Sequence, residues 1–141
     1  MFNDKDYTEI LALIAKERQA RIRQRPQETL EGGDVMKVGD KYYIGVSART
    51  NEEGIRQFAE HFAKFGFETV AVPLSEVLHL KTGVNYLENN KMLVSGEFID
   101  KEVFAEYDKM IVPEEEAYGA NCIWMNGTVI VPEGYPAVQA A

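Results

Sequence analysis

Three residues of the types that carry acid–base chemistry stand beside predicted strands. A carboxylate that accepts a histidine N–H fixes the ring tautomer and makes the other nitrogen a better base. An arginine can hold a substrate carboxylate with a bidentate fork. The candidates are Glu31 in the acidic turn Leu30-Glu31-Gly32-Gly33-Asp34-Val35, Arg49 in Ser47-Ala48-Arg49-Thr50 and His79 in Leu78-His79-Leu80-Lys81-Thr82. If they converge, they could form a general-base site for a substrate that bears a carboxylate.

Each of these residues also has a structural interpretation. Glu31 fits an acidic surface turn in which the paired glycines supply φ > 0. His79 fits a buried histidine with satisfied hydrogen bonds at the start of a strand, and Arg49 fits an exposed charge in a helix-capping segment. Convergence in three dimensions is the condition that separates the two interpretations.

The remaining histidine and the single cysteine give weaker signals. Cys122 begins an apolar strand, which favours a buried inert thiol, because a nucleophilic cysteine needs a partly exposed electropositive setting. His61 lies on the flank of a predicted helix and is expected in solvent. The two histidines are far apart, and the sequence contains no His-x-x-x-His or Cys-x-x-Cys spacing, so it predicts no metal site.

The elements that must position these residues repeat along the chain as hairpin, helix and returning strand. Asn126-Gly127 is the strongest hairpin turn, since a type I′ turn needs φ > 0 twice. The sequence predicts an N-terminal helix over 6–20 and units at about 30–72, 78–112 and 120–141. Within the units we expect hairpins around Gly39-Asp40, Glu88-Asn89-Asn90 and Asn126-Gly127, helices over 52–65 and 101–107, and returning strands Glu68–Val72 and Lys109–Val112.

Two helices of this pattern have recognisable signals. Ile55, Phe58, Phe62 and Phe65 form one apolar stripe over 52–65. Asp100 is the expected cap of the helix over 101–107. A recurrence every ~40 residues predicts an α/β fold of the propeller or repeat-array type, with both ends of the array open.

The length, net charge and composition of the chain limit the classes of protein to which it can belong. A chain of 141 residues is the usual size of one domain, and its net charge of −8 argues against nucleic-acid and anionic-membrane partners. The basic run Lys16, Arg18, Arg21, Arg23 and Arg25 is therefore interpreted as a cationic helix end rather than a nucleic-acid patch. No stretch is apolar enough for a membrane span or a signal peptide, and one cysteine suits a reducing compartment, so we expect a cytoplasmic protein.

Taken together, five stretches resemble the dimethylarginine dimethylaminohydrolase family, in the family's order and spacing. They cover most of the chain, from about residue 8 to Pro136, and are Leu30–Val35, Gly45–Asn51, Leu78–Gly83, Pro113–Tyr118 and Ala120–Trp124. The resemblance implies an incomplete pentein-type α/β propeller of about three repeats. It also implies hydrolysis of methylated arginine to citrulline and a methylamine, without a cofactor.

By the same resemblance, Glu31 corresponds to the carboxylate that orients the catalytic histidine, and His79 to that histidine. Arg49 corresponds to the arginine that binds the amino-acid end of the substrate. Lys81 stands where the related arginine deiminases carry an aspartate, which favours the methylarginine branch. The family's nucleophilic cysteine belongs to a C-terminal segment that nothing in this sequence matches, and Cys122 matches a non-catalytic cysteine.

These observations lead to one main hypothesis and two alternatives. The chain is expected to be a central fragment with the base half of the site, inactive alone or dependent on complementation, and to form a homo-oligomer or bind a complementing fragment. The first alternative is a non-catalytic pentein module that binds a ligand or a protein. The second is a remnant that folds without a function.

Overall fold

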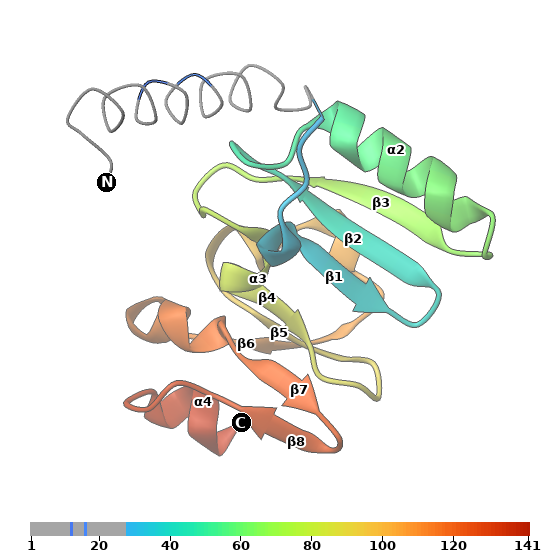
Figure 1. The fold of residues 1–141 in the computed structure, drawn as a ribbon. Coiled ribbons are helices and arrows are strands. Elements are labelled where there is room, and N and C mark those ends of the chain that lie inside the picture. Colours follow the sequence, from blue (N-terminus) through green and yellow to red (C-terminus); the bar gives the residue numbers. More distant parts are fainter. Residues whose placement is uncertain (1–11, 13–15, 17–27) are drawn as a thin grey trace, which may run out of the picture.

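The computed structural model describes Ala12, Lys16 and residues 28–141 (Figure 1). The helix expected over 6–20 and the basic run that ends at Arg25 lie outside the described residues, apart from Ala12 and Lys16. The described part is an α/β structure in which two three-stranded sheets and one two-stranded sheet follow one another through the molecule. None of its helices has the length and apolar character needed to cross a membrane.

The first sheet has the order β1-β2-β3. β1 and β2 are antiparallel across the expected Gly39-Asp40 turn, with Val38 opposite Lys41. β3 then returns parallel to β2, so that Val46 pairs with Pro73. The elements of this unit are β1 (Val35–Val38), β2 (Lys41–Val46), α2 (Glu52–Ala63) and β3 (Glu68–Pro73).

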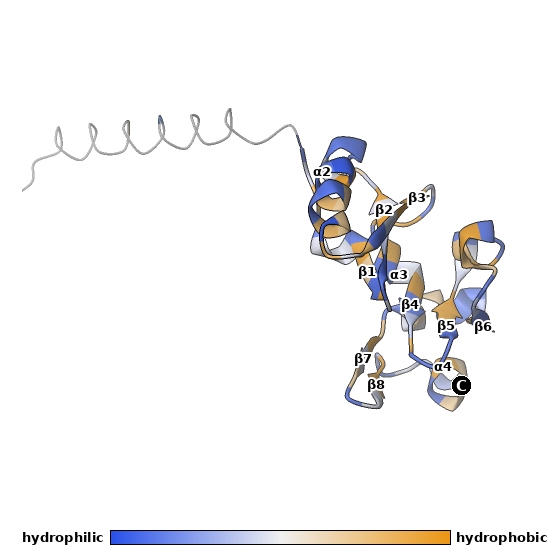
Figure 2. Ribbon diagram, turned by 90° about the vertical axis from the view of Figure 1, so that its right-hand side faces the viewer, coloured by the Kyte–Doolittle hydropathy of each residue, from blue (hydrophilic) through white to orange (hydrophobic). Residues whose placement is uncertain are grey.

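Helix α2 covers one face of the first sheet (Figure 2). It begins at the cap Asn51, whose side chain accepts a 2.8 Å hydrogen bond from Gly54 N. The rings of Phe58 and Phe62 pack on Tyr42 with centroids 5.0 Å away. The expected stripe is wrong at its end: the helix stops at Ala63 and Phe65 is 67% exposed. Phe67 takes the place against Tyr42 instead, with centroids 5.2 Å apart.

The second sheet repeats this arrangement, with β4 antiparallel and β6 parallel to β5. The helix expected over 101–107 is wrong: only one 3₁₀ turn, η3 (Glu102–Phe104), lies within it, and Lys101 rather than Asp100 precedes that turn. This single turn buries Phe104 fully, and β6 begins at Asp108, whose N–H donates to Asn90 O at 2.8 Å, so only one turn lies between Lys101 and the strand. The elements are α3 (Leu80–Gly83), β4 (Val84–Tyr86), β5 (Lys91–Val94), η2 (Gly96–Phe98), η3 (Glu102–Phe104) and β6 (Asp108–Ile111).

The third sheet is the hairpin β7–β8 alone within the described residues. Its turn is the predicted one, with φ of 51° at Asn126 and 79° at Gly127. All of its strand residues are exposed. The elements here are η4 (Glu114–Ala120), β7 (Ile123–Met125), β8 (Thr128–Ile130) and α4 (Pro136–Ala140).

Buried apolar side chains lie between neighbouring sheets. The first cluster joins the first and second sheets, and its members include Met36, Tyr43, Val72, Leu80, Val84, Met92, Phe98 and Phe104. The second cluster joins the second sheet to the third unit and contains Leu93, Val112, Ala120, Cys122 and Val138. Apolar side chains of neighbouring sheets are therefore buried against one another at both junctions.

The first cluster generates a stability prediction. Phe104 is fully buried and contacts the rings of Tyr43 and Phe98, with centroids 5.2 and 6.3 Å away. We expect Phe104→Ala to lower the free energy of unfolding by about 3–5 kcal/mol, because it leaves a cavity between two units. The matched control is Phe65→Ala, whose exposed ring should change it by less than about 0.5 kcal/mol. Urea unfolding followed by tryptophan fluorescence measures both, and similar losses would contradict the assigned core.

Candidate active site

Glu31 stands immediately before the 3₁₀ turn η1 (Gly32–Asp34), which leads into β1. Its backbone N–H donates to Thr50 Oγ1 at 2.9 Å. One oxygen of its carboxylate, Oε1, accepts a hydrogen bond from Gly33 N at 3.3 Å. The other oxygen, Oε2, faces the side chains of His79 and Arg49.

The expected reason for the paired glycines is wrong, since neither has a positive φ. Gly33 is required by a close approach instead. A Cβ at this position would lie 3.0 Å from Cγ of His79, whereas one at Gly32 would meet nothing within 4 Å. The histidine ring therefore lies against the backbone of the turn that presents Glu31.

His79 is not at the start of a strand, as the sequence predicted, but caps the short helix α3. Its ring is largely buried, with the side chain 18% exposed, and Nε2 lies 3.2 Å from Glu31 Oε2. The guanidinium of Arg49 approaches the same oxygen, with Nη1 3.6 Å away and the side chain 60% exposed. The structure thus brings together Glu31, His79 and Arg49, although they come from three separate segments.

Asp34 is the residue of the site that the sequence analysis missed. It is fully buried and sits at the centre of the three segments. Its Oδ2 accepts hydrogen bonds from Ser47 Oγ and Thr50 Oγ1, both at 2.7 Å, and its Oδ1 accepts one from Leu80 N at 3.0 Å. The sequence did contain a signal that could have identified Asp34. It is a carboxylate just before an apolar strand, and the hydroxyl residues Ser47 and Thr50 follow the strand that pairs with it.

Asp34 also faces the histidine. Nδ1 of His79 is buried, lies 3.5 Å from Asp34 Oδ1 and has no hydrogen-bond partner among the described residues. Both ring nitrogens therefore face carboxylate oxygens, Glu31 on one side and Asp34 on the other.

Cys122 lies elsewhere, in the core between the second sheet and the third unit. Burial raises the pKa of its thiol, which opposes formation of the thiolate that acts as a nucleophile. Lys81 lies on α3 and lines a pocket of about 350 Å³ that also reaches Cys122 and Trp124. Within residues 28–141, the structure shows no group of three or more His, Cys, Asp or Glu side chains placed to hold a metal ion.

Comparison with known proteins places this chain in a family. Residues 11–125 match the family model for arginine deiminase. The chain belongs to the arginine deiminase family. Over 111 residues it is 54% identical to the N(G),N(G)-dimethylarginine dimethylaminohydrolase of Pseudomonas aeruginosa, covering 79% of this chain and 44% of the relative. Over 101 residues it is 39% identical to the protein of the same name from Streptomyces coelicolor, covering 71% and 38% respectively.

Solved structures show the same fold. A mutant of the Pseudomonas aeruginosa protein complexed with citrulline superposes with a TM-score of 0.80 at 50% identity, covering 82% of this chain and 46% of that one. The amidinotransferase SxtG from Microseira wollei matches with a TM-score of 0.69 over 82% of this chain and 40% of that one, and its 20% identity shows the fold alone. The chain spans less than half the length of the curated relatives given above.

The contact between Gly33 and His79 generates a prediction with a neighbouring control. We expect Gly33→Ala to lower the free energy of unfolding by about 1–3 kcal/mol, because the new Cβ overlaps the imidazole ring. Gly32→Ala, one residue earlier, should change it by less than about 0.5 kcal/mol. Chemical denaturation of the two variants measures the difference, and equal effects would show that the ring does not lie against this turn.

Proposed function

We propose that this chain contributes the acid–base half of an active site that hydrolyses methylated arginine to citrulline and a methylamine. The observation that carries the proposal is the 3.2 Å approach of Glu31 to His79, which the fold creates between distant segments. Relatives named dimethylarginine dimethylaminohydrolase that are 54% and 39% identical support it. We also propose that the protein works in the cytoplasm, because a chain with one cysteine suits a reducing compartment.

In the proposed reaction, a cysteine thiolate attacks the guanidinium carbon and forms a carbon–sulfur bond. His79 donates its proton to the methylamine as the carbon–nitrogen bond breaks. The ring then takes a proton from water, whose oxygen attacks the thiouronium carbon, and the thiolate leaves as citrulline forms. Glu31 holds the ring, and the exposed guanidinium of Arg49 binds the substrate carboxylate.

The proposed nucleophile comes from polypeptide other than residues 1–141. Cys122 is the only cysteine of the sequence, and its buried thiol has a raised pKa. An active enzyme would therefore need a second segment that carries a reactive cysteine close to His79. By itself the chain is proposed to be inactive.

A citrulline assay tests this proposal. We expect the chain alone to release no citrulline from asymmetric dimethylarginine, because covalent catalysis lacks its nucleophile. Release that Cys122→Ser abolishes would contradict this expectation. Adding the parts of the Pseudomonas aeruginosa relative that this chain does not match should produce activity, and His79→Asn should then reduce it about 10²–10⁴-fold.

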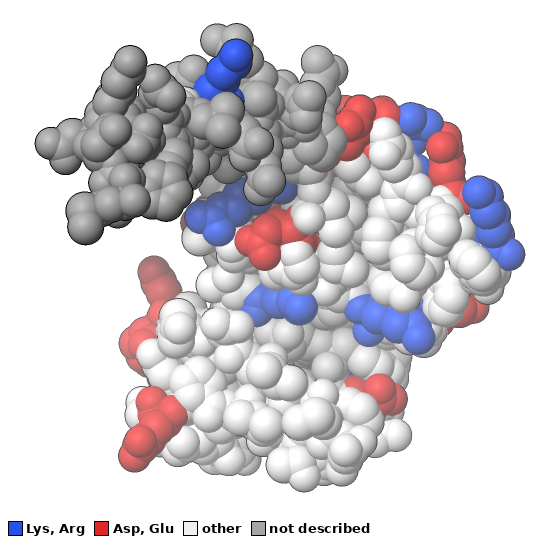
Figure 3. Space-filling view, viewed as in Figure 1, with Lys and Arg blue, Asp and Glu red and all other residues white. Residues whose placement is uncertain are grey.

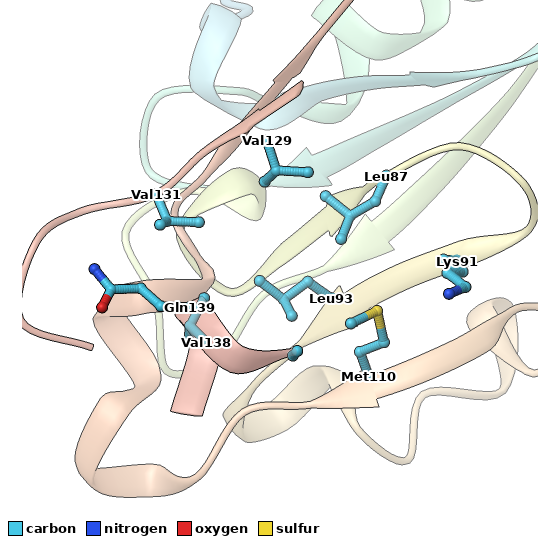
Figure 4. Close-up of a pocket in the computed structure, with 9 residues that line it drawn as sticks. Leu87, Lys91, Leu93, Met110, Val129, Val131, Val138 and Gln139 are labelled. Atoms are coloured by element: carbon cyan, nitrogen blue, oxygen red, sulfur yellow. The ribbon is translucent and has the colours of Figure 1, made fainter. Parts of the chain in front are cut away.

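We further propose that the units at about 30–72, 78–112 and 120–141 are consecutive blades of one partial propeller domain. Association would take place through the third unit, whose exposed apolar side chains are Ile123, Trp124, Met125, Val129 and Ile130. The surface there is largely uncharged, at the bottom of Figure 3. Beside it, a pocket of about 280 Å³ is lined mainly by apolar side chains, among them Leu87, Leu93 and Met110 (Figure 4). Such an apolar face favours a partner, either a second copy or a complementing fragment.

Light scattering at high micromolar concentration tests the association. We expect a dimer or larger homo-oligomer, and a shift toward monomer in Ile130→Lys, which places a charge on the exposed hairpin. Phe65→Lys is the control, because that ring is exposed at the end of α2, away from the hairpin. A well-folded wild-type monomer would count against self-association through β8.

A further inference from the structure

The loop between β3 and His79 has no regular secondary structure, yet its backbone is held firmly. Backbone N–H groups need hydrogen-bond partners when they leave water. Here three successive ones converge on the carboxylate of Glu97 from η2. Its Oε1 accepts hydrogen bonds from Ser75 N at 3.1 Å, Glu76 N at 2.8 Å and Val77 N at 3.3 Å. Its Oε2 accepts another from Ser75 Oγ at 2.9 Å.

Lys101 completes this anchor. Its Nζ lies 3.1 Å from Glu97 Oε2, and the Glu97 side chain is only 6% exposed. The same Nζ donates to Pro73 O at 2.8 Å, at the start of the loop. Burial alone would raise the pKa of Glu97, but the hydrogen bonds from Glu76, Ser75 and Lys101 outweigh it and lower the pKa to about 2.

A second carboxylate holds the chain on the far side of the histidine, where Leu80 N donates to Asp34 Oδ1 at 3.0 Å. His79 thus lies between two anchors, Glu97 before it and Asp34 after it. We propose that Glu97 is a positioning residue for His79, which fixes the loop 74–79 so that the imidazole stays against Glu31 and Gly33. The catalytic consequence rests on the function proposed above, but the positioning itself does not.

The chemistry of the anchor explains why a carboxylate is needed. A charged acceptor forms stronger hydrogen bonds than a neutral one and can serve several N–H groups at once. Gln at position 97 would keep one accepting oxygen but would turn an amide N–H₂ toward the ammonium of Lys101. Ala would leave the N–H groups of residues 75–77 without an acceptor, and the loop would relax. A displacement of about 1 Å at a catalytic group can lower the reaction rate about 10²-fold, even when a distant substitution causes it.

Proton NMR of the full chain tests the proposal at the histidine itself. The sequence has two histidines, so His61→Gln as a common background leaves the ring of His79 as the single imidazole signal. In that background we expect a cross-peak between the His79 ring and the Gly33 α-protons, because the two are in contact. Glu97→Gln should weaken the cross-peak, Glu97→Ala should abolish it, and the amides of residues 75–77 should exchange about tenfold faster.

The matched control is Glu106→Gln. Glu106 belongs to the same unit and also accepts hydrogen bonds, from Lys41 Nζ at 2.9 Å and from the Tyr43 hydroxyl (Oη) at 3.2 Å. It should leave the His79 cross-peak unchanged. An unaltered cross-peak in folded Glu97→Gln and Glu97→Ala, or an equal loss in Glu106→Gln, would overturn the proposal. If no citrulline is released even after the missing segments are added, the proposed activity is refuted, but the positioning of His79 by Glu97 is not.

The pH dependence supplies a second measurement on the Gln variant. Folding lowers the pKa of Glu97 from 4.5 to about 2, so its stabilisation is complete above pH 4.5 and is lost as the pH falls toward 2. The charged side chains near it are Lys101, whose Nζ lies 3.1 Å from Oε2, and Glu76, whose Oε2 would lie 3.9 Å from a Cβ at Gly96. The stability difference between wild type and Glu97→Gln should therefore be constant above about pH 4.5 and shrink below it. A difference that does not change with pH would show that the carboxylate charge is not what holds the loop.

Discussion

The buried carboxylate of Asp34 is the constraint around which the candidate site is arranged. A carboxylate without water is costly unless its oxygens receive hydrogen bonds. Its donors are Ser47, Thr50 and Leu80, so β1, the turn after β2 and the start of α3 must meet around it. Glu31 lies three residues before Asp34, Arg49 lies between two of the donors, and His79 immediately precedes the third. Satisfying one buried charge therefore assembles all three site residues.

The site also depends on the contact between units. Glu31 and Arg49 belong to the first unit and His79 to the start of the second, and the apolar cluster between the two sheets holds these units together. At the other end of the strands, the hydroxyls of Tyr43 and Tyr107 lie 2.8 Å apart and Lys41 pairs with Glu106 at 2.9 Å. Apolar packing and polar contacts thus fix the relative position of the units. The candidate site is therefore formed by two neighbouring units together and by neither of them alone.

The sequence predicted much of the local structure because local chemistry decides it. Asn126-Gly127 forms the expected hairpin turn since both residues adopt positive φ readily, and a helix begins at Glu52, as its apolar stripe predicted. The three candidate residues were also selected by type and position. Errors arose where tertiary contacts overrode local preference. Residues 101–107 form one 3₁₀ turn rather than a helix because Asp108 already pairs with Asn90 as β6 begins. Leu80 begins α3 rather than a strand, and its backbone N–H donates to Asp34.

The sequence by itself determined which residues could do chemistry and where the hairpins turn, because those features depend on residue type and on neighbours along the chain. Only the tertiary structure decided that Glu31 and His79 meet, that Gly33 is small because an imidazole ring lies on it, and that Asp34 and Glu97 hold the backbone on either side of that ring. The physical reason is the same in each case. Hydrogen-bond donors and ring contacts that come from distant segments have no signature in sequence spacing, and they exist only once the units pack.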